Sequence, residues 1–322
     1  MISISGQYIL ETILHSLQAA GIQETWIVVN QHKEIIQNHF KYGKSIGLKI
    51  EYIEQPEEGG IGQAVSLCEE VVGNDPHFML VYGDVLKAGN HFKHLLGRFE
   101  RIGSGALATI AHPLSDGNYG NIYLSHDMQI SKFLEKPEGA RMSNYILGGS
   151  FILGRDCFEF LSQNNQDMAF YYQHLISENR MSASLWEDSW IDISRPWHIL
   201  AANQMMMKPW NTSIIPDSVS IDPNVNIKGT VQFGENVHIC SGTTIVGPCY
   251  IGSNVFIGNN SLIRKNSSIG SNCKIGYGCE VKNAILFGNS TVGRLSFIGD
   301  SVLGENVQLG SGSMTVNHDS LG

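Results

Sequence analysis

A large apolar residue returns at every sixth position between residues 215 and 287. A β-strand alternates its side chains and an α-helix turns every ~3.6 residues, so neither gives this period. One inward residue in six predicts a coil with flat sides, and three sides close one triangular coil. Glycine, asparagine, aspartate or lysine often follows the apolar residue, as tight corners require. The predicted inward residues are Ile215, Ile221, Ile227, Phe233, Ile239, Ile245, Ile251, Ile257, Ile263, Ile269, Ile275, Val281 and Phe287.

Successive coils stack these residues into ladders. One ladder is Ile221, Ile239, Ile257 and Ile275, and the next is Ile227, Ile245, Ile263 and Val281. Each rung rises by about 4.8 Å, the spacing of neighbouring strands, so stacking buries a continuous apolar column. This pattern is that of the hexapeptide-repeat left-handed parallel β-helix. Such a domain serves either as an acyltransferase or as a scaffold that makes trimers, and the fold alone leaves both open.

Length and composition bound the rest of the chain. The 322 residues are enough for two domains, which we place at 1–207 and 208–322. The net charge of -9, without a Lys/Arg run, argues against a nucleic-acid partner. The sequence shows no signal peptide and no long apolar run, so we expect a cytoplasmic protein without a membrane segment. The cysteines show no CxxC, and Cys273 and Cys279 fall on successive sides of the coil, which suggests neither zinc nor a structural disulfide.

Helical and strand patterns alternate in the first domain, which predicts a parallel α/β fold. Residues 143–154 form a predicted strand in which Gly148 and Gly149 mark the close approach of another backbone or a ring. The other predicted helices are 7–20, 32–40, 61–72, 92–101 and 197–207, and the other predicted strands are 24–30, 48–53, 78–82, 105–111, 119–122, 132–137 and 190–193.

Two places in this domain carry candidate chemistry. Asp84 comes just past the carboxyl end of a predicted strand, where open α/β sheets bind ligands. It could hold a metal or face a phosphate, or simply be a turn residue after Gly83. Glu135 and Lys136 end another strand, and they are either a solvated ion pair or a source of positive charge for a sugar phosphate.

These strings, in this order and followed by the six-residue repeat, resemble the sugar-1-phosphate nucleotidylyltransferases. The likeness is strongest to long-form glucose-1-phosphate thymidylyltransferases and to bifunctional sugar-phosphate uridylyltransferase/acetyltransferases. Residues 55–64 (QPEEGGIGQA) look like the base-reading loop, in which Gln55 and the backbone of Gly60 would meet the pyrimidine. The Gln-Pro opening and the Gln-Ala ending at Gln63 are closer to the thymidylyl version.

The resemblance also assigns the phosphate and sugar positions. Asp84 and Asp192 match the two strand-end aspartates that hold Mg²⁺, and Asp84 also belongs to the nucleotide site. The sugar-phosphate contacts match Gly120, Glu135, Lys136 and Asn144. The implied reaction is attack of a sugar-1-phosphate oxygen on the α-phosphate of a nucleoside triphosphate, with Asp84, Lys136 and Asp192 in catalytic roles.

The sequence departs from the family at two places. Residues 1–7 match the segment that comes after the family's Pro-Lys, so we expect a Rossmann-like domain without its first strand and phosphate loop, in an apparently N-terminally truncated sequence. Arg294 stands where acetyltransferase members carry a histidine base, and a guanidinium does not accept a proton at neutral pH. We therefore expect no acetyl transfer.

Together these features predict a Mg²⁺-dependent sugar-1-phosphate nucleotidylyltransferase homologue that forms trimers through its β-helix. The resemblance favours dTTP and glucose-1-phosphate, with UTP possible. The alternative is a non-catalytic sugar-nucleotide-binding or regulatory subunit, and an acetyltransferase is a third reading that Arg294 disfavours.

Overall fold

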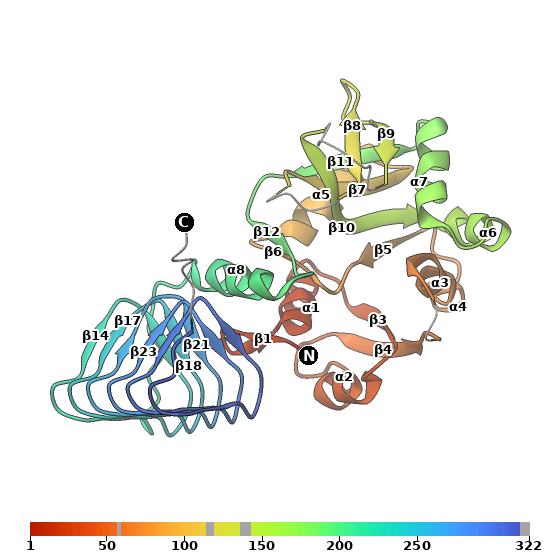
Figure 1. The fold of residues 1–322 in the computed structure, drawn as a ribbon. Helices are drawn as coiled ribbons and strands as arrows, with labels where there is room; N and C mark the ends of the chain where they lie inside the picture. Colours follow the sequence, from red (N-terminus) through yellow and green to blue (C-terminus); the bar gives the residue numbers. More distant parts are fainter. Residues whose placement is uncertain (57–58, 114–118, 136–142, 316–322) are drawn as a thin grey trace. The chain divides into compact units, whose positions relative to one another are not determined.

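The computed structural model describes residues 1–56, 59–113, 119–135 and 143–315. Compactness divides the chain into two units, shown together in Figure 1. The first unit contains Met1 and Leu10–Ser189, and the second contains Ile2–Ile9 and Trp190–Gly322. The domain boundary predicted between residues 207 and 208 stays a prediction.

The first unit alternates helices and strands, as its sequence predicts. Its helices are α1 (Ile9–Ala19), α2 (Lys33–Phe40), α3 (Ile61–Ser66), α4 (Glu69–Val72), α5 (His91–Ile102), α6 (Asp156–Gln163) and α7 (Met168–Ser177). Its strands are β3 (Glu24–Val29), β4 (Lys49–Glu54), β5 (His77–Val81), β6 (Val85–Lys87), β7 (Ala106–Ala111), β8 (Asn121–Leu124), β9 (Ile130–Leu134), β10 (Tyr145–Gly154) and β11 (Met181–Trp186). The helix predicted over 61–72 is divided into α3 and α4, and the helix predicted from residue 7 begins at Ile9.

Strand pairing in this unit is only partly parallel. The first two predicted strands, β3 and β4, pair in parallel as a two-stranded sheet of their own. The larger sheet has the order β11-β7-β10-β8-β9, with β5 also paired to β10. Strand β11 runs parallel to β7, whereas β10 is antiparallel to β5, β7 and β8. The long strand β10 therefore makes the sheet mixed, which its sequence alone did not reveal.

Helices cover both faces of the larger sheet. Every residue of β7 is buried, because a central strand must bury both of its faces. Leu107 of β7 and Ile152 of β10 pack with the apolar side of α5. Their neighbours in the two strands, such as Ala108 and Phe151, pack with the apolar residues of α6 and α7.

The second unit contains the predicted parallel β-helix, drawn as stacked green to blue coils in Figure 1. One side stacks β13 (Ser220–Ile221), β16 (His238–Ile239), β19 (Phe256–Ile257), β22 (Lys274–Ile275), β25 (Thr291–Val292) and β28 (Gln308–Leu309). A second stacks β14 (Asn226–Lys228), β17 (Thr244–Val246), β20 (Leu262–Ile263), β23 (Glu280–Lys282) and β26 (Phe297–Gly299). The third stacks β15 (Val231–Phe233), β18 (Cys249–Ile251), β21 (Ser267–Ile269), β24 (Ile285–Leu286) and β27 (Val302–Leu303). The pairings reproduce both predicted isoleucine ladders.

One predicted inward residue is wrong. Ile251 pairs with Ile269 eighteen residues later, but Ile269 pairs with Leu286 only seventeen residues later. Leu286 is therefore the buried residue of its coil, and Phe287 is half-buried. The corner before the third side is one residue shorter, since positive-φ Asn283 comes two residues after Val281, whereas Asn266 comes three residues after Ile263 in the coil before. The next coil repeats the short corner, with Asp300 two residues after Ile298. At the other end of the stack, Ile215 and Ile221 are half-exposed because each lies at the start of the coils.

Asparagine shapes one corner of the coils. Asn236, Asn254, Asn272 and Asn289 all adopt positive φ, which asparagine tolerates better than most residues. Their side-chain amides donate in sequence from Asn236 to Asn254, from Asn254 to Asn272 and from Asn272 to Asn289, over 3.0–3.3 Å. The corner is thus held both by backbone conformation and by a ladder of amides.

The second unit also contains the strands β1 (Ser3–Ile4), β2 (Gln7–Tyr8) and β12 (Trp190–Asp192) and the helix α8 (Pro196–Met207). Strands β1 and β2 form an antiparallel hairpin whose turn, Ser5 and Gly6, has positive φ at both residues. A Cβ atom added at Gly6 would lie 2.4 Å from the ring of Tyr250, so only glycine fits there. The hairpin therefore lies directly against the β-helix.

Candidate functional site

The predicted base-reading loop is held together by glutamine. Gln55 follows β4, and its Nε2 donates to the carbonyl of Gly60 at 2.9 Å and to Oε1 of Gln63 at 3.2 Å. A Cβ atom added at Gly59 would lie 1.5 Å from Gln63 Oε1, so a larger residue there would displace the two amides from each other. The structure thus places Gln55, Gly60 and Gln63 in one hydrogen-bonded group, and their role in reading a base stays a prediction.

Backbone contacts fix this loop to its surroundings. The N–H of Gln55 donates to the carbonyl of Val29 at 2.8 Å, and Asn30 Nδ2 donates to the carbonyl of Pro56 at 3.2 Å. On the helix that comes next, a Cβ atom at Gly62 would lie 1.7 Å from the carbonyl oxygen of Gln166. The loop is therefore anchored at both ends.

Asp84 lies in the turn between β5 and β6, where its side chain is exposed. The residues around the turn pack closely: the N–H of Tyr82 donates to the carbonyl of Gly149 at 2.9 Å. Gly149 has φ +69°, and a Cβ atom there would lie 3.0 Å from Val85 and 3.1 Å from Tyr82. The close approach predicted at Gly148 and Gly149 is confirmed, and the ring is that of Tyr82.

Two of the predicted ligand-binding carboxylates act on this ring. Burial raises the pKa of Tyr82, its interaction with Tyr172 lowers it, and the negative charges of Glu135 and Asp84 make smaller contributions that raise it. Asp84 and Glu135 thus both contribute to the pKa of Tyr82.

Lys87 is a further charged residue, influenced by the charge of Asp84, that the sequence analysis did not identify. Its Nζ donates to Ser150 Oγ at 3.0 Å. Burial lowers the pKa of Lys87 to about 7, and the charge of Asp84 opposes that shift. Burial, with smaller effects of Lys87 and His94, lowers the pKa of His91 to about 2. A lysine three residues after Asp84, in a strand of otherwise apolar residues, was the available signal.

The other predicted site residues are Gly120, Asn144, Lys136 and Asp192. Gly120 is enclosed, since a Cβ atom there would lie 2.5 Å from the ring of Phe133. The carbonyl of Asn144 is 3.1 Å from Nδ1 of His112, and the Asn144 residue is exposed. Lys136 lies outside the described residues. Asp192 ends β12 in the second unit, so its pairing with Asp84 on a metal stays a prediction.

Arg294 occupies an exposed turn of the β-helix. Its guanidinium lies over the ring of Tyr277, 5.8 Å from the centroid, as in a cation–π contact. A guanidinium donates hydrogen bonds and accepts none, so this residue supplies no general base.

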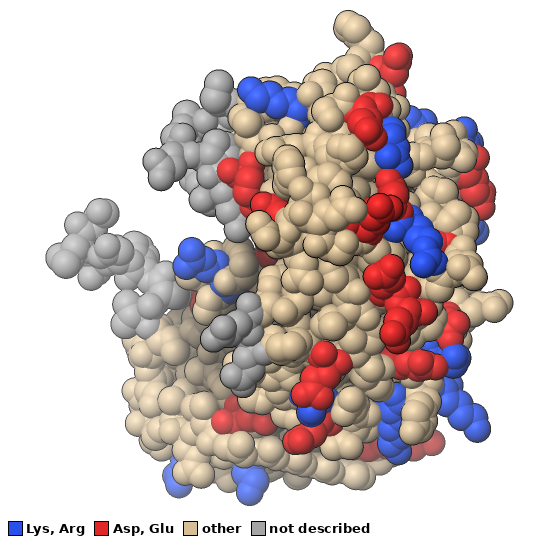
Figure 2. Space-filling view, turned by 90° about the vertical axis from the view of Figure 1, so that its right-hand side faces the viewer, with Lys and Arg blue, Asp and Glu red and all other residues tan. Residues whose placement is uncertain are grey.

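On the face drawn in Figure 2, acidic and basic side chains are intermixed, and the described residues form no continuous basic surface there. Over the described part of the chain, no helix has the length and apolar character needed to cross a bilayer.

Family comparisons cover nearly the whole chain. Residues 1–208 match the nucleotidyl transferase family, and residues 245–322 match the GMPPB C-terminal domain. The bifunctional protein GlmU of Methanocaldococcus jannaschii is 29% identical over an alignment of 323 positions that covers 98% of this chain and 75% of that protein. The GlmU protein of Methanococcus maripaludis strain C7 is 33% identical over 324 residues, with the same coverage.

Two further similarities extend this picture. The bifunctional sugar-1-phosphate nucleotidylyltransferase/acetyltransferase of Sulfurisphaera tokodaii is 28% identical over 325 residues, covering 98% of this chain and 76% of that protein. The crystal structure of a putative glucose-1-phosphate thymidylyltransferase from Bacillus anthracis, in complex with a sucrose, superposes with a TM-score of 0.60. It covers 66% of this chain and 87% of the other at 17% identity, so it supports the fold alone.

Proposed function

Because the chain belongs to the nucleotidyl transferase family, we propose that it transfers a nucleotidyl group from a nucleoside triphosphate to a sugar 1-phosphate. A phosphate oxygen of the sugar attacks the α-phosphorus, the bond from that phosphorus to the bridging oxygen breaks, and pyrophosphate leaves with the electron pair. Little covalent chemistry falls to the protein in such a transfer, so positioning and charge neutralisation supply the catalysis.

The observation that carries this proposal is the match of residues 1–208 to the nucleotidyl transferase family, in which Asp84 occupies the exposed turn between β5 and β6. The resemblance assigns Asp84 to the nucleotide and metal and Glu135 to the sugar phosphate. Substrate groups held by these two residues would meet at the same place, as transfer between them requires.

The base-reading role falls to the loop at Gln55. Its amide is already held against Gly60 and Gln63, so little side-chain freedom is lost when a base binds. Because Nε2 already donates to Gly60 and Gln63, Oε1 of Gln55 is left to accept a hydrogen bond from the N–H on the edge of a pyrimidine. We infer a preference for dTTP, with UTP as the second substrate, because the loop ends in Gln63.

The Asp84 carboxylate fits a divalent cation. It is exposed at a turn, and oxygen ligands suit Mg²⁺, which keeps several waters and binds one or two carboxylates beside phosphates. When bound, such an ion neutralises charge on the triphosphate. The second carboxylate, Asp192, is inferred from sequence, as is the role of Lys136. Gly120 and Asn144 complete the proposed sugar-phosphate contacts.

The test is a pyrophosphate-release assay with the full chain. Glucose 1-phosphate and N-acetylglucosamine 1-phosphate are each paired with dTTP, UTP and GTP in the presence of Mg²⁺. We expect release with dTTP and glucose 1-phosphate, and loss of that release after Asp84→Asn. The control is Asp75→Asn, which makes the same change at another exposed position of this unit.

Two outcomes would contradict the proposal. Binding of dTTP without pyrophosphate release would favour the non-catalytic sugar-nucleotide-binding alternative. Acetyl transfer from acetyl-CoA would contradict the inference drawn from Arg294.

We further propose that the β-helix assembles the chain into trimers in the cytoplasm. Leu295 and Met314 are 76% and 72% exposed on this unit and offer apolar surface for such contacts. Light scattering on the purified chain tests the trimer directly, since a monomeric mass would exclude it.

A further inference from the structure

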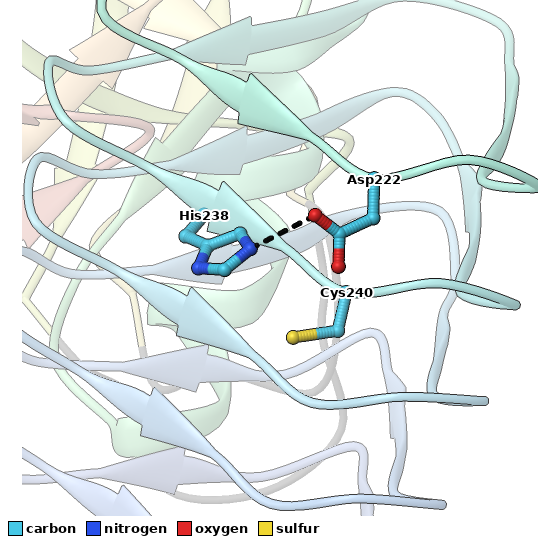
Figure 3. Close-up of side chains that lie close together, drawn as sticks. All are labelled: Asp222, His238 and Cys240. Atoms are coloured by element: carbon cyan, nitrogen blue, oxygen red, sulfur yellow. Dashed lines mark hydrogen bonds and ion pairs between the residues drawn. The ribbon is translucent and has the colours of Figure 1, made fainter.

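Three side chains of different metal-binding types gather at one place in the β-helix. They are Asp222, His238 and Cys240, and their ligand atoms all lie within 4.8 Å of one another. His238 Nε2 is 3.1 Å from Oδ1 of Asp222. Figure 3 shows the carboxylate, the imidazole and the thiol directed toward one shared space.

Strand pairing fixes this arrangement. Ile221 pairs with Ile239, so Asp222 and Cys240, the residues directly after them, are stacked in successive coils. The N–H of Asp222 donates to the carbonyl of Ile239 at 3.0 Å, and the N–H of Cys240 donates to that of Ile257 at 2.9 Å. The backbone of both residues is therefore held by the β-helix, independently of any bond between their side chains.

Strand alternation supplies the third group. His238 and Cys240 are separated by Ile239, which is fully buried in the interior, so both flanking residues lie on the opposite side of the chain. The His238 ring also packs edge-on against Phe256 of the next coil, with 5.7 Å between centroids. That contact orients the imidazole beside Asp222.

The three side chains of the cluster differ in their exposure to solvent. Cys240 is buried, at 7% exposure, whereas the side chains of His238 and Asp222 are 46% and 35% exposed. An ion bound here would have its thiolate ligand buried against the β-helix. Its fourth coordination position would face solvent. The exposed pair leaves room for an ion to enter.

We propose that Asp222, His238 and Cys240 bind a zinc ion that links the first coils of the β-helix. Nitrogen, sulfur and carboxylate oxygen are the ligands zinc takes in proteins, and a thiol excludes hard ions such as Mg²⁺. Tetrahedral zinc with these bond lengths separates its ligand atoms by about 3.3–3.8 Å. The 3.1 Å between His238 Nε2 and Asp222 Oδ1 is close to that range. The ligand atoms that lie farther apart, up to 4.8 Å, would need to approach each other by about 1 Å through rotation of their side chains.

The site has a structural use at this end of the stack. Ile221, next to Asp222, is 41% exposed, so the coil that carries it buries less apolar surface than the coils above. A bridging ion would tie that coil to the next one. Because such an ion binds the folded chain, it would stabilise the β-helix by mass action.

The test uses the full chain, stripped of metal with a chelator and kept reduced. Zinc is titrated in competition with a chromophoric chelator, and cobalt(II) is added separately as a spectroscopic probe. We expect one ion per chain and a cobalt–thiolate absorption band. Loss of a partner behind a metal ligand typically costs about 10–100-fold in affinity, so loss of a ligand itself should cost at least as much.

The variants are Asp222→Asn, His238→Gln and Cys240→Ser, each expected to weaken zinc binding by at least about tenfold. Matched controls are Cys68→Ser and His174→Gln, the latter removing a histidine 3.6 Å from Glu178. Circular dichroism checks that each variant is folded. If Cys240→Ser does not fold, His238→Gln decides, because that side chain is at the surface.

Equal zinc affinity in the wild type and in these three variants would overturn the proposal. So would cobalt binding without a thiolate band. Either result would reduce the cluster to a hydrogen bond between Asp222 and His238 beside an unrelated cysteine.

Discussion

Ser5 and Asn203 are joined by two hydrogen bonds to the same amide oxygen. The N–H of Ser5 donates to Asn203 Oδ1 at 3.1 Å, and the Ser5 hydroxyl donates to it at 2.9 Å. The amide nitrogen of Asn203 donates in turn to the carbonyl of Asn266 at 2.8 Å. One fully buried side chain thus connects the hairpin β1-β2, the helix α8 and a coil of the β-helix.

We expect Asn203→Ala to lower the free energy of unfolding by about 2–4 kcal/mol, since the change leaves buried partners unsatisfied. Chemical denaturation followed by circular dichroism measures it. The exposed Asn74→Ala should change stability by no more than about 0.5 kcal/mol. A similarly small effect at Asn203 would show that water replaces its contacts.

The isoleucine ladder should be weaker at its first rung. Ile257 is fully buried, so Ile257→Ala should cost about 2–5 kcal/mol through lost burial and the cavity left behind. Ile221, in the same ladder, is 41% exposed, and Ile221→Ala should cost under about 1 kcal/mol. Denaturation midpoints of the pair test the gradient, and equal costs would contradict it.

Two glycines should respond in opposite directions to alanine. Gly149→Ala places a Cβ atom 3.0 Å from Val85 at a φ of +69°, so it should destabilise the chain by at least about 1–2 kcal/mol. Gly97 lies in α5 with no atom within 4 Å of an added Cβ, so Gly97→Ala should stabilise it by about 0.5–1 kcal/mol. Thermal unfolding distinguishes the two signs, and a neutral Gly149→Ala would show that the turn relaxes.

Lys87 should make stability depend on pH. Its pKa is about 7 in the folded chain against 10.5 for an ordinary lysine, so the unfolded chain alone holds this proton between those values. The contribution of Lys87 to the free energy of unfolding therefore rises as the pH increases from about 7 to 10, by at most about 1.4 kcal/mol per pH unit. Lys87→Met should remove that slope and stabilise the chain at pH 7.

Urea denaturation of both proteins across this pH window measures the difference. The control is Lys93→Met, which changes an exposed lysine of α5 and should leave the slope intact. Parallel profiles for the wild type and Lys87→Met would show that Lys87 stays charged in the folded chain.

Gln55 should affect nucleotide binding more than turnover, under the proposed function. Removing one hydrogen-bonding amide costs about 1 kcal/mol, so Gln55→Ala should raise KM for dTTP severalfold with kcat little changed. Gln163→Ala, at an exposed position of α6, is the control. An unchanged KM would remove the base-reading role from this loop.

The β-helix was predictable because its signal is periodic. Ile239, Ile257 and Ile275 each contribute the same inward position, so no single residue decides the fold. Phe287 was predicted as the inward residue because a strict count of six does not detect that one corner is a residue shorter. Leu286 takes that position. The helices α6 and α7 were not predicted, since α7 (MAFYYQHLIS) carries apolar residues around most of its circumference. The N-cap of α7, where Asp167 accepts from the N–H of Phe170, was the sequence signal available.

The sequence located individual residues of the site from the strands that they follow. Asp84 and Gln55 each come after a strand, which the pattern of apolar residues locates. Their neighbours were not located in this way, because Lys87 meets Ser150 only once β6 and the long strand β10 are placed in the fold. The cluster at Asp222 could have been found from the repeat itself, since Asp222 and Cys240 are one coil apart. Cysteine spacing alone overlooked it.

Two successive coils that are one residue shorter show how this architecture accommodates changes in length. Each shortening is confined to one corner, and the neighbouring strands remain paired in parallel. Each coil contacts only its neighbours, so a lost residue is absorbed locally instead of shifting the register of every later strand. Insertions and deletions can therefore accumulate along this edge during evolution, while the hydrophobic interior keeps its alignment.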